Sequence, residues 1–190
     1  RDLPVYVYQI QDKFRDELRA KSGLLRGIEF MMKDLYSFHA SGQDLDAYYE
    51  KMKTVYRNIF EKAGIGDITY ITFASGGSFS KYSHEFQTVT AAGEDTIYLC
   101  ESCRVAVNKE IINEQNYCPV CGNKNLVEKR SIEVGNIFNL KTRFSDAFGL
   151  SYKDSEGRVC PVLMGFYCIG LGRLLGAIVE VHHDEKGMIW

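Results

Sequence analysis

Two pairs of cysteines with the same internal spacing constrain this chain more than any other feature of its sequence. Cys100 and Cys103 form the first pair, and Cys118 and Cys121 form the second, with 14 residues between the pairs. Four thiolates from two such turns can surround one ion tetrahedrally, as in structural zinc sites that leave no coordination position open. We therefore expect residues 98–122 to form a small zinc-ribbon-like insertion that holds a structural Zn²⁺. Iron is a lesser alternative, and four reduced, buried cysteines without a metal are the simplest one.

The bulk composition is that of an ordinary globular protein. The chain has 190 residues, of which 45% are hydrophobic and 25% charged, and its formal net charge is −2. This length suits one compact domain with a small appendage. The slightly negative charge argues against a protein whose whole surface binds nucleic acid. No run of about 18 apolar residues occurs and the first residues lack a signal-peptide core, so we expect a cytoplasmic protein without a membrane span.

Short runs of β-branched and aromatic residues predict a mostly antiparallel sheet. Residues 5–10 begin a strand that continues toward residue 17, turns at 21–23 and returns over 27–35. Other strands are expected at 67–73, 85–90, 131–138 and 159–168, with a hairpin at 151–158. Helices are expected at 44–63, 142–148 and 171–181. Strands and helices do not alternate regularly, which favours an α+β fold over a parallel α/β fold.

Two separated segments carry side chains suited to ATP. Arg15, Glu17, Arg26 and Phe30 lie on and beside the first hairpin, and Arg173 lies where the last helix begins. The guanidinium group can hold a phosphate with two hydrogen bonds and stays protonated, and a helix N-terminus favours anions. Taken alone, an Arg-x-Glu sequence is more commonly a solvated ion pair worth less than about 1 kcal/mol. The combination of both segments in one chain favours the nucleotide-binding interpretation.

These segments resemble motifs 2 and 3 of the class II aminoacyl-tRNA synthetases, in the version found in the bacterial-type prolyl-tRNA synthetase family. Similar stretches cover nearly the whole chain and include residues 8–17, 24–39, 83–86, 132–138, 165–175 and 182–190. The resemblance implies a class II catalytic core, a mostly antiparallel sheet flanked by helices, over residues 1–97 and 123–190. The zinc-ribbon-like insertion at 98–122 interrupts this core.

The same resemblance implies a reaction and roles for the nucleotide-binding residues. The reaction is the activation of proline by ATP with Mg²⁺ to prolyl-adenylate, followed by transfer to tRNA(Pro). Arg15 would contact the α-phosphate and the amino-acid carboxylate, and Arg173 the γ-phosphate; these two are the expected catalytic residues. Glu17 would lie near the adenine amino group and the tRNA end, Arg26 near the outer phosphates, and Phe30 would stack on adenine.

A proline pocket is implied as well. Glu85 would face the proline ammonium, His84 would support Glu85, and Phe86 would line the pocket. Phe166 and Cys168 add bulk near it. Without the resemblance, His84 would be interpreted as satisfying a loop and Glu85 as exposed. The chain departs from the usual family pattern at Ile28, Asn136, Lys141, Phe166, Cys168 and Gly172.

Further parts of such an enzyme are expected outside this chain. The resemblance places motif 1, which forms the homodimer, and a Thr-x-Glu proline-binding loop before Arg1, and the anticodon-binding domain after Trp190. We therefore expect a fragment of a larger enzyme. Residues 103–110 resemble the stretch that precedes the large editing domain of many bacterial prolyl enzymes. Only about twenty residues separate this stretch from residue 132, where the resemblance resumes, so no such domain is expected here.

Two other functions fit parts of the sequence. The altered motif 3 is compatible with a non-catalytic synthetase paralogue that binds a nucleotide or a protein partner, and the binding of ATP and proline would separate this from the enzyme. A zinc-ribbon module that binds nucleic acid is the third hypothesis. It predicts a basic ribbon, whereas Glu101, Glu110 and Glu114 accompany the basic residues there.

Overall fold

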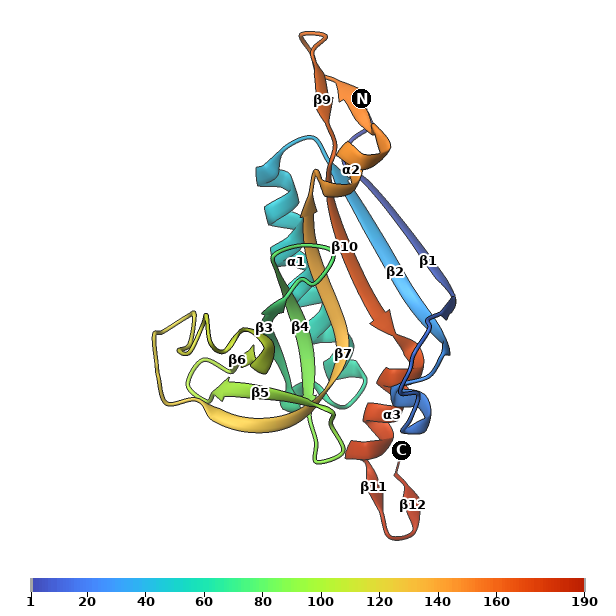
Figure 1. Cartoon of the computed structure of the whole chain (residues 1–190), viewed down its shortest axis with the longest axis vertical. Coiled ribbons are helices and arrows are strands. Elements are labelled where there is room, and N and C mark those ends of the chain that lie inside the picture. Colours follow the sequence, from blue (N-terminus) through green and yellow to red (C-terminus); the bar gives the residue numbers. More distant parts are fainter. Residues whose placement is uncertain (1, 190) are drawn as a thin grey trace.

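The computed structural model describes residues 2–189 and is built around one eight-stranded sheet (Figure 1). The spatial order of its strands is β1-β2-β10-β7-β4-β3-β6-β5. Their bounds are β1 (Val5–Phe14), β2 (Glu29–His39), β3 (Thr69–Ser75), β4 (Tyr82–Val89), β5 (Asp95–Cys100), β6 (Val105–Asn108), β7 (Val127–Lys141) and β10 (Leu163–Gly170). Among these pairings only β3 with β6 is parallel, so the predicted α+β fold with a mostly antiparallel sheet is confirmed.

The long strand β7 belongs to two parts of the sheet at once. Its C-terminal half pairs with β10, where Cys168 lies opposite Asn136. Its N-terminal part pairs with β4 on one edge and with β5 on the other, and both pairings meet at Ser131. The pairings β7–β4–β3–β6–β5–β7 therefore close into a ring beside the open half of the sheet.

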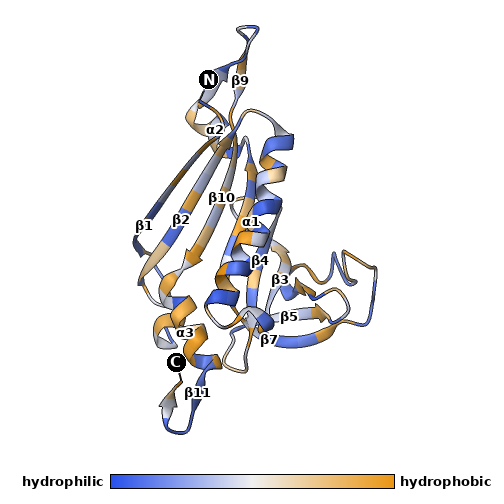
Figure 2. Ribbon diagram, turned by 180° about the vertical axis from the view of Figure 1, so that it is seen from behind, coloured by the Kyte–Doolittle hydropathy of each residue, from blue (hydrophilic) through white to orange (hydrophobic). Residues whose placement is uncertain are grey.

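The long helix α1 (Gly42–Lys62) covers one face of the sheet, as Figure 2 shows from behind. Ser41 caps its first turn, because the Ser41 hydroxyl accepts a hydrogen bond from the backbone N–H of Asp44 at 3.2 Å. The stripe that α1 buries consists of Leu45, Tyr49, Met52, Tyr56 and Phe60, at the three- and four-residue steps expected of an amphipathic helix. Four of these residues, Tyr49, Met52, Tyr56 and Phe60, form the main core together with inward residues of β4, β7 and β10.

The remaining elements lie at the two ends of the sheet. The apolar helix α3 (Leu171–Val181) follows β10 directly and packs beside the first hairpin (Figure 2). At the opposite end, α2 (Arg143–Phe148) leads into a projecting hairpin of β8 (Ser151–Lys153) and β9 (Val159–Pro161) (Figure 1). A small hairpin of β11 (His183–Asp184) and β12 (Gly187–Met188) ends the described chain. Among residues 2–189, no helix has the length and apolar character needed to cross a membrane.

The predicted elements are present, with shifts at their ends. The predicted helix at 171–181 has its predicted bounds, and the one at 44–63 starts two residues earlier because Ser41 caps it. Strands β5 and β6 were not predicted. They take residues 98–100 and 105–108 of the expected insertion into the main sheet, so the part that projects is shorter than 98–122. Trp190, the end of one family-like stretch, lies outside the described residues.

Candidate active site

The face of the sheet opposite α1 lines a cavity of about 760 Å³. That volume is in the usual range for small-molecule sites. Its floor is a polar row across four neighbouring strands, in which Asp34 of β2 lies opposite Cys168 of β10, Cys168 opposite Asn136 of β7, and Asn136 opposite Glu85 of β4. Because strand side chains alternate between faces, the residues on either side of these four point toward α1.

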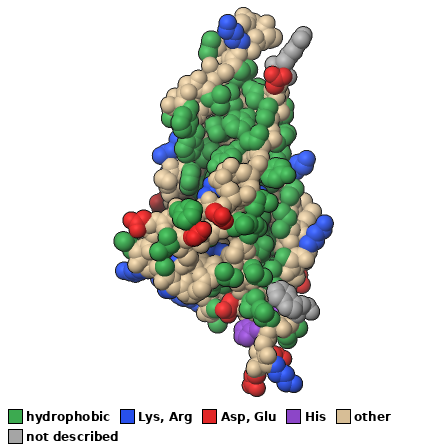
Figure 3. Space-filling model, turned by 90° about the vertical axis from the view of Figure 1, so that its right-hand side faces the viewer, with side chains coloured by type: hydrophobic (Ala, Val, Ile, Leu, Met, Phe, Trp, Pro, Cys, Tyr) green, Lys and Arg blue, Asp and Glu red, His purple; other side chains and the backbone are tan. Residues whose placement is uncertain are grey.

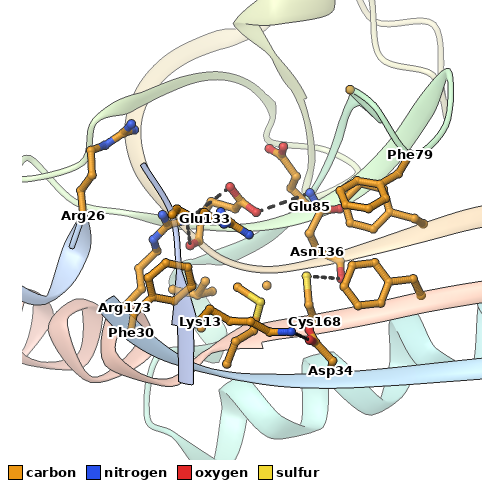
Figure 4. A pocket seen from close by; sticks show the side chains of 18 of the residues that line it. Lys13, Arg26, Phe30, Asp34, Phe79, Glu85, Glu133, Asn136, Cys168 and Arg173 are labelled. Atoms are coloured by element: carbon orange, nitrogen blue, oxygen red, sulfur yellow. Dashed lines mark hydrogen bonds and ion pairs between the residues drawn. The ribbon is translucent and has the colours of Figure 1, made fainter. Parts of the chain in front are cut away.

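An aromatic row lies next to the polar one. Phe166 of β10 is opposite Tyr36 of β2 on one side and Phe138 of β7 on the other. The ring of Phe166 stacks on Tyr36 at 4.7 Å between centroids and on Phe138 at 5.6 Å. Phe79, from the loop between β3 and β4, approaches Phe138 to 5.0 Å and closes this side of the cavity (Figure 4). The cavity thus has apolar walls beside its polar floor.

The first hairpin brings two of the predicted arginines to the cavity. Arg15 follows β1, and its guanidinium carbon lies 5.0 Å from the centroid of the Phe30 ring, a cation–π contact. Arg26 lies across the hairpin loop, where its Nε donates to Glu94 at 2.7 Å and its Nη1 is 3.4 Å from the Glu17 carboxylate. The four nucleotide-binding residues predicted on this hairpin all line the cavity; they are Arg15, Glu17, Arg26 and Phe30.

Arg173 enters the same cavity from the first turn of α3. Its Nε donates to the backbone oxygen of Leu25 at 3.0 Å and its Nη1 to that of Glu133 at 3.3 Å. Gly176 leaves room for this approach, since a Cβ there would lie 2.8 Å from the Leu25 side chain. Glycine therefore lets α3 and the hairpin loop contact each other closely. Arg15, Arg26 and Arg173 thus all line one cavity, and their contacts with ATP stay a prediction.

The polar floor carries hydrogen-bond acceptors that lack donors. Asp34 is 1% exposed; its Oδ2 is 2.7 Å from Lys13 Nζ, whereas its Oδ1 has no hydrogen-bond partner among the described residues. The same is true of Asn136 Oδ1. A buried acceptor left unpaired costs about 1–3 kcal/mol. A ligand with N–H donors would satisfy both atoms, so this part of the cavity suits an ammonium group.

Glu85 lies at the far end of the floor among other acidic groups. Its Oε2 accepts hydrogen bonds from Gln87 Nε2 and Asn108 Nδ2, both at 2.9 Å. Burial, together with the negative charges of Glu133 and Asp95, raises the pKa of Glu85 to about 8, although the two hydrogen bonds act in the opposite direction. Burial also raises the pKa of Glu133, against the lowering effect of nearby Arg173. Figure 4 shows Glu85, Glu133 and Asn136 around the same part of the cavity.

Two predicted pocket residues lie on the other face of β4. Phe86 is 1% exposed and packs on Tyr56 and Phe60 of α1 at 5.0 and 5.3 Å. His84 Nδ1 is 2.8 Å from the Tyr49 hydroxyl, and burial lowers the pKa of His84 to about 3, so the ring is neutral. Phe86 was expected to line the pocket and His84 to support Glu85, but the structure places both side chains on the face toward α1, because adjacent strand residues face opposite sides. Phe166 and Cys168 do line the cavity.

Several lining residues were not predicted to have a site role. They are Lys13, Asp34, Tyr36, Phe79, Glu133, Asn136 and Phe138. Steps of two residues along β2 from Phe30 reach Met32, Asp34 and Tyr36. The alternation of strand side chains between the two faces of the sheet is therefore the sequence signal that identifies the cavity residues of β2. Lys13 and Phe79 lie on different segments, and only the folded chain brings them to the cavity.

The four cysteines form the predicted cluster. Their sulfur atoms all lie within 4.8 Å of one another, and those of Cys100 and Cys121 are 3.8 Å apart. Tetrahedral zinc with Zn–S bonds of about 2.3 Å separates its sulfurs by about 3.8 Å, so the cluster fits this ion. A residue with a left-handed backbone conformation follows each cysteine pair. These residues are Arg104, at φ 54°, and Gly122, at φ 75°, so the two cysteine turns have similar backbones. Asn123 Nδ2 also approaches the Cys100 sulfur, at 3.9 Å.

Fold and cavity together define the class of protein. Residues 1–182 match the family model described as the tRNA synthetase class II core domain (G, H, P, S and T). The chain belongs to this family, as its motifs predicted.

Relatives within the family are named as proline–tRNA ligases. That of Sulfurimonas denitrificans is 41% identical over 100% of this chain, which covers 48% of that protein. The probable mitochondrial proline–tRNA ligases of Schizosaccharomyces pombe and Rattus norvegicus are 38% and 36% identical, again over the whole chain, which covers 45% and 40% of them. The predicted prolyl resemblance is confirmed, and the chain spans about half the length of the curated relatives it matches.

Proposed function

We propose that this chain is the catalytic core of a proline–tRNA ligase, which activates proline with ATP to form prolyl-adenylate for transfer to tRNA(Pro). One observation supports this most directly. One cavity holds three arginines at one end and, at the other, buried acceptors without hydrogen-bond donors beside an aromatic row. The first end suits a triphosphate, and the second suits a small amino acid with an apolar ring.

The arginines serve the phosphoryl chemistry. A proline carboxylate oxygen attacks the α-phosphorus of ATP, a new P–O bond forms, and the bond to pyrophosphate breaks. Arg15 stabilises the α-phosphate and orients the incoming carboxylate, while Arg26 and Arg173 hold the outer phosphates and the leaving pyrophosphate. ATP enters with Mg²⁺ as part of the substrate. These groups act by alignment and charge stabilisation, which suffices because both reactants are anions.

Phe30 and Glu17 serve the adenine. We propose that Phe30 stacks on the base and that Glu17 accepts from its amino group. Arg15 already lies over the Phe30 ring, so a planar base beside that ring would have a cation as a neighbour. In the same hairpin, Arg26 is bound to Glu94 and Glu17. Exchange of one of these carboxylates for a phosphate keeps the guanidinium paired.

The polar floor and aromatic row serve the amino acid. The proline ammonium carries two N–H donors, and Glu85, Asp34 and Asn136 offer acceptors on the floor. Its ring fits the row that contains Phe166, with Cys168 beside it. His84 contributes indirectly, since it holds Tyr49 of α1 behind the floor.

Several parts of the proposal concern the whole protein. We propose tRNA(Pro) as the acceptor, a homodimer as the assembly and the cytoplasm as the location. The relatives' names support the first. The third stays a prediction because two of those relatives are named mitochondrial. We also propose one structural Zn²⁺ at Cys100, Cys103, Cys118 and Cys121, supported by the sulfur separations.

ATP–pyrophosphate exchange, measured with each amino acid in turn on the full-length protein, tests this function. We expect exchange with proline and with no other amino acid at comparable concentration. Exchange with another amino acid but not with proline would refute the proposed substrate. Calorimetric binding of ATP without any exchange would instead indicate a non-catalytic paralogue.

A further inference from the structure

The ribbon that carries the four cysteines is connected to the amino-acid end of the cavity. β6 starts two residues after Cys103 and ends at Asn108. Asn108 is 4% exposed, and its Nδ2 donates to Glu85 Oε2 at 2.9 Å. Four residues of one short strand therefore join a cysteine turn to the carboxylate on the cavity floor.

Asn108 is held from its other side as well. Its Oδ1 accepts the backbone N–H of Glu110 at 3.0 Å and starts the short 3-10 turn η3 (Lys109–Ile111). Glu110 itself lines the cavity. The Asn108 amide thus spans the corner between β6 and η3, with its oxygen bound to the ribbon and its nitrogen to Glu85.

Two donors meet on one oxygen of Glu85. Gln87 comes from the same strand, and its Nε2 also binds Asp95 at 2.8 Å. Asn108 comes from β6, which pairs with β3 and β5 and begins two residues after the first cysteine turn. The loss of one of two hydrogen-bond donors from a buried carboxylate costs free energy and allows the carboxylate to change its orientation. The position of Glu85 toward a ligand therefore depends on β6.

We propose that Asn108 is a positioning residue for the amino-acid site, and that metal binding by the four cysteines keeps it in place. This inference rests on the proposed function, because it assigns Glu85 to the amino acid. Arg15 follows β1, Arg26 lies in the loop of the first hairpin and Arg173 lies in α3, so each arginine is held by contacts other than those of Asn108. Disturbance of Asn108 should therefore affect the amino acid and leave ATP unaffected.

The test compares two substitutions of Asn108 with a neighbouring control in the full-length protein. Asn108→Ala removes both contacts, whereas Asn108→Asp keeps an oxygen for the Glu110 N–H and puts a second acceptor against Glu85. Lys109→Ala changes the next, exposed residue. In ATP–pyrophosphate exchange we expect the KM for proline to rise about tenfold or more in both Asn108 variants. The KM for ATP should stay within about twofold, and Lys109→Ala should resemble the parent.

Cys121→Ser tests the metal arm. We expect the zinc content to fall, the KM for proline to rise as in Asn108→Ala, and the double variant to show no further increase, since both changes break one connection. Proline-induced thermal stabilisation gives a second readout and should weaken in parallel. Additive effects in the double variant, or equal increases in the KM for ATP, would overturn the inference. So would a parent-like KM for proline in a folded, zinc-containing Asn108→Asp protein.

The parent protein separates this inference from the proposed function. If the parent shows no proline-dependent exchange, the proposed function fails. If it does, and the Asn108 variants behave as the control does, only the inference fails.

Discussion

At the scale of single residues, the cavity distinguishes between arginines of one short loop. Arg15 and Arg19 are both exposed, but Arg15 lines the cavity and lies on the Phe30 ring, whereas Arg19, four positions later, does not line the cavity. Sequence alone marks both as basic residues of the same hairpin. Their different surroundings provide a matched pair for experiments.

Arg15→Ala and Arg173→Ala should each slow adenylate formation at least about 100-fold, which is the typical effect of removing one group that stabilises transition-state charge. Arg19→Ala should leave the rate near that of the parent. Single-turnover measurement of prolyl-adenylate formation checks this. Losses under about threefold for both Arg15 and Arg173 would show that these residues do not bind the reacting phosphates.

Truncation of Phe86 should mainly affect stability, whereas truncation of Phe79 should mainly affect proline binding. Phe86 packs on Tyr56 and Phe60 in the core, so Phe86→Ala should lower the free energy of unfolding by about 3–5 kcal/mol. Phe79 closes the aromatic side of the cavity, so Phe79→Ala should mainly raise the KM for proline. Chemical denaturation and exchange kinetics on both variants provide the comparison. A stable Phe86→Ala protein with impaired proline binding would reinstate the original pocket assignment.

Glu85 gives a prediction about pH. Its pKa is raised to about 8 from an ordinary value near 4.5, so most of it is protonated at neutral pH and ionises as the pH rises through 8. An ammonium ligand prefers the ionised form, and the KM for proline should therefore fall between about pH 7 and pH 9. In the absence of proline the sign is reversed. The stability contributed by the neutral carboxyl is fully present below about pH 4.5 and is lost as the pH rises through 8.

Glu85→Gln is the control for that prediction. It should bind proline weakly at every pH in this window and should lose the stability change that extends from about pH 4.5 to about pH 8. Kinetics between about pH 7 and pH 9 and thermal melts from about pH 4.5 to pH 9 measure the two effects. A parent KM for proline that rises with pH would contradict the assignment of Glu85 to the ammonium.

The sequence predicted the residues of the cavity better than their directions. Arg15, Glu17, Arg26, Phe30 and Arg173 could be predicted because their motifs are specific and their segments are separate. His84 and Phe86 could not both share a pocket with Glu85, since three consecutive strand residues alternate between faces. Phe166, Cys168 and Asn136 each depart from the family pattern, and the folded sheet shows that they are neighbours.

At the scale of elements, long periodic segments were predictable and short buried ones were not. The buried stripe of α1 and the apolar α3 have clear patterns. β6 has four buried residues and no alternation, and it follows a cysteine turn, so nothing in its pattern separates it from the insertion. β7 changes partners along its length and shows a register shift opposite Phe86 and Gln87. A single-strand pattern does not encode such a change.

The element-scale prediction concerns the cysteine turns. We expect one zinc ion per chain in protein purified without chelator, because the four sulfurs lie within 4.8 Å of one another. Its removal should expose the four thiols and loosen residues 101–126 before the arginine end of the cavity responds. Elemental analysis and thiol titration measure this, and Cys160→Ser serves as a control outside the cluster. Protein without metal whose four thiols all react freely would refute the site.

At the scale of the whole molecule, β1 forms an edge of the sheet with apolar side chains on the surface. Tyr8 is 73% exposed and Ile10 is 55% exposed. Figure 3 shows the hydrophobic side chains gathered on this side of the molecule. Among the described residues, no strand pairs with the outer edge of β1. Such an edge is open to pairing with another chain.

We therefore expect residues 1–190, produced alone, to self-associate in a concentration-dependent way. Ile10→Lys places a charge on this strand and should shift the protein toward monomer, whereas Lys51→Ala, on the exposed side of α1, should not. Light scattering coupled to size exclusion measures the mass. A parent chain that stays monomeric at every concentration tested would refute the prediction.

The ring of strands around β5 has one further consequence. Ile97 is paired with Asn108 on one side and with Lys129 on the other, so the chain leaves the sheet and returns to it two strand spacings apart, about 10 Å. A foreign domain whose own ends lie about that far apart could replace residues 109–126 without changing a strand pairing, provided that it kept those ends fixed. This corner of the molecule is thus a position at which another domain can be inserted to build chimaeric proteins.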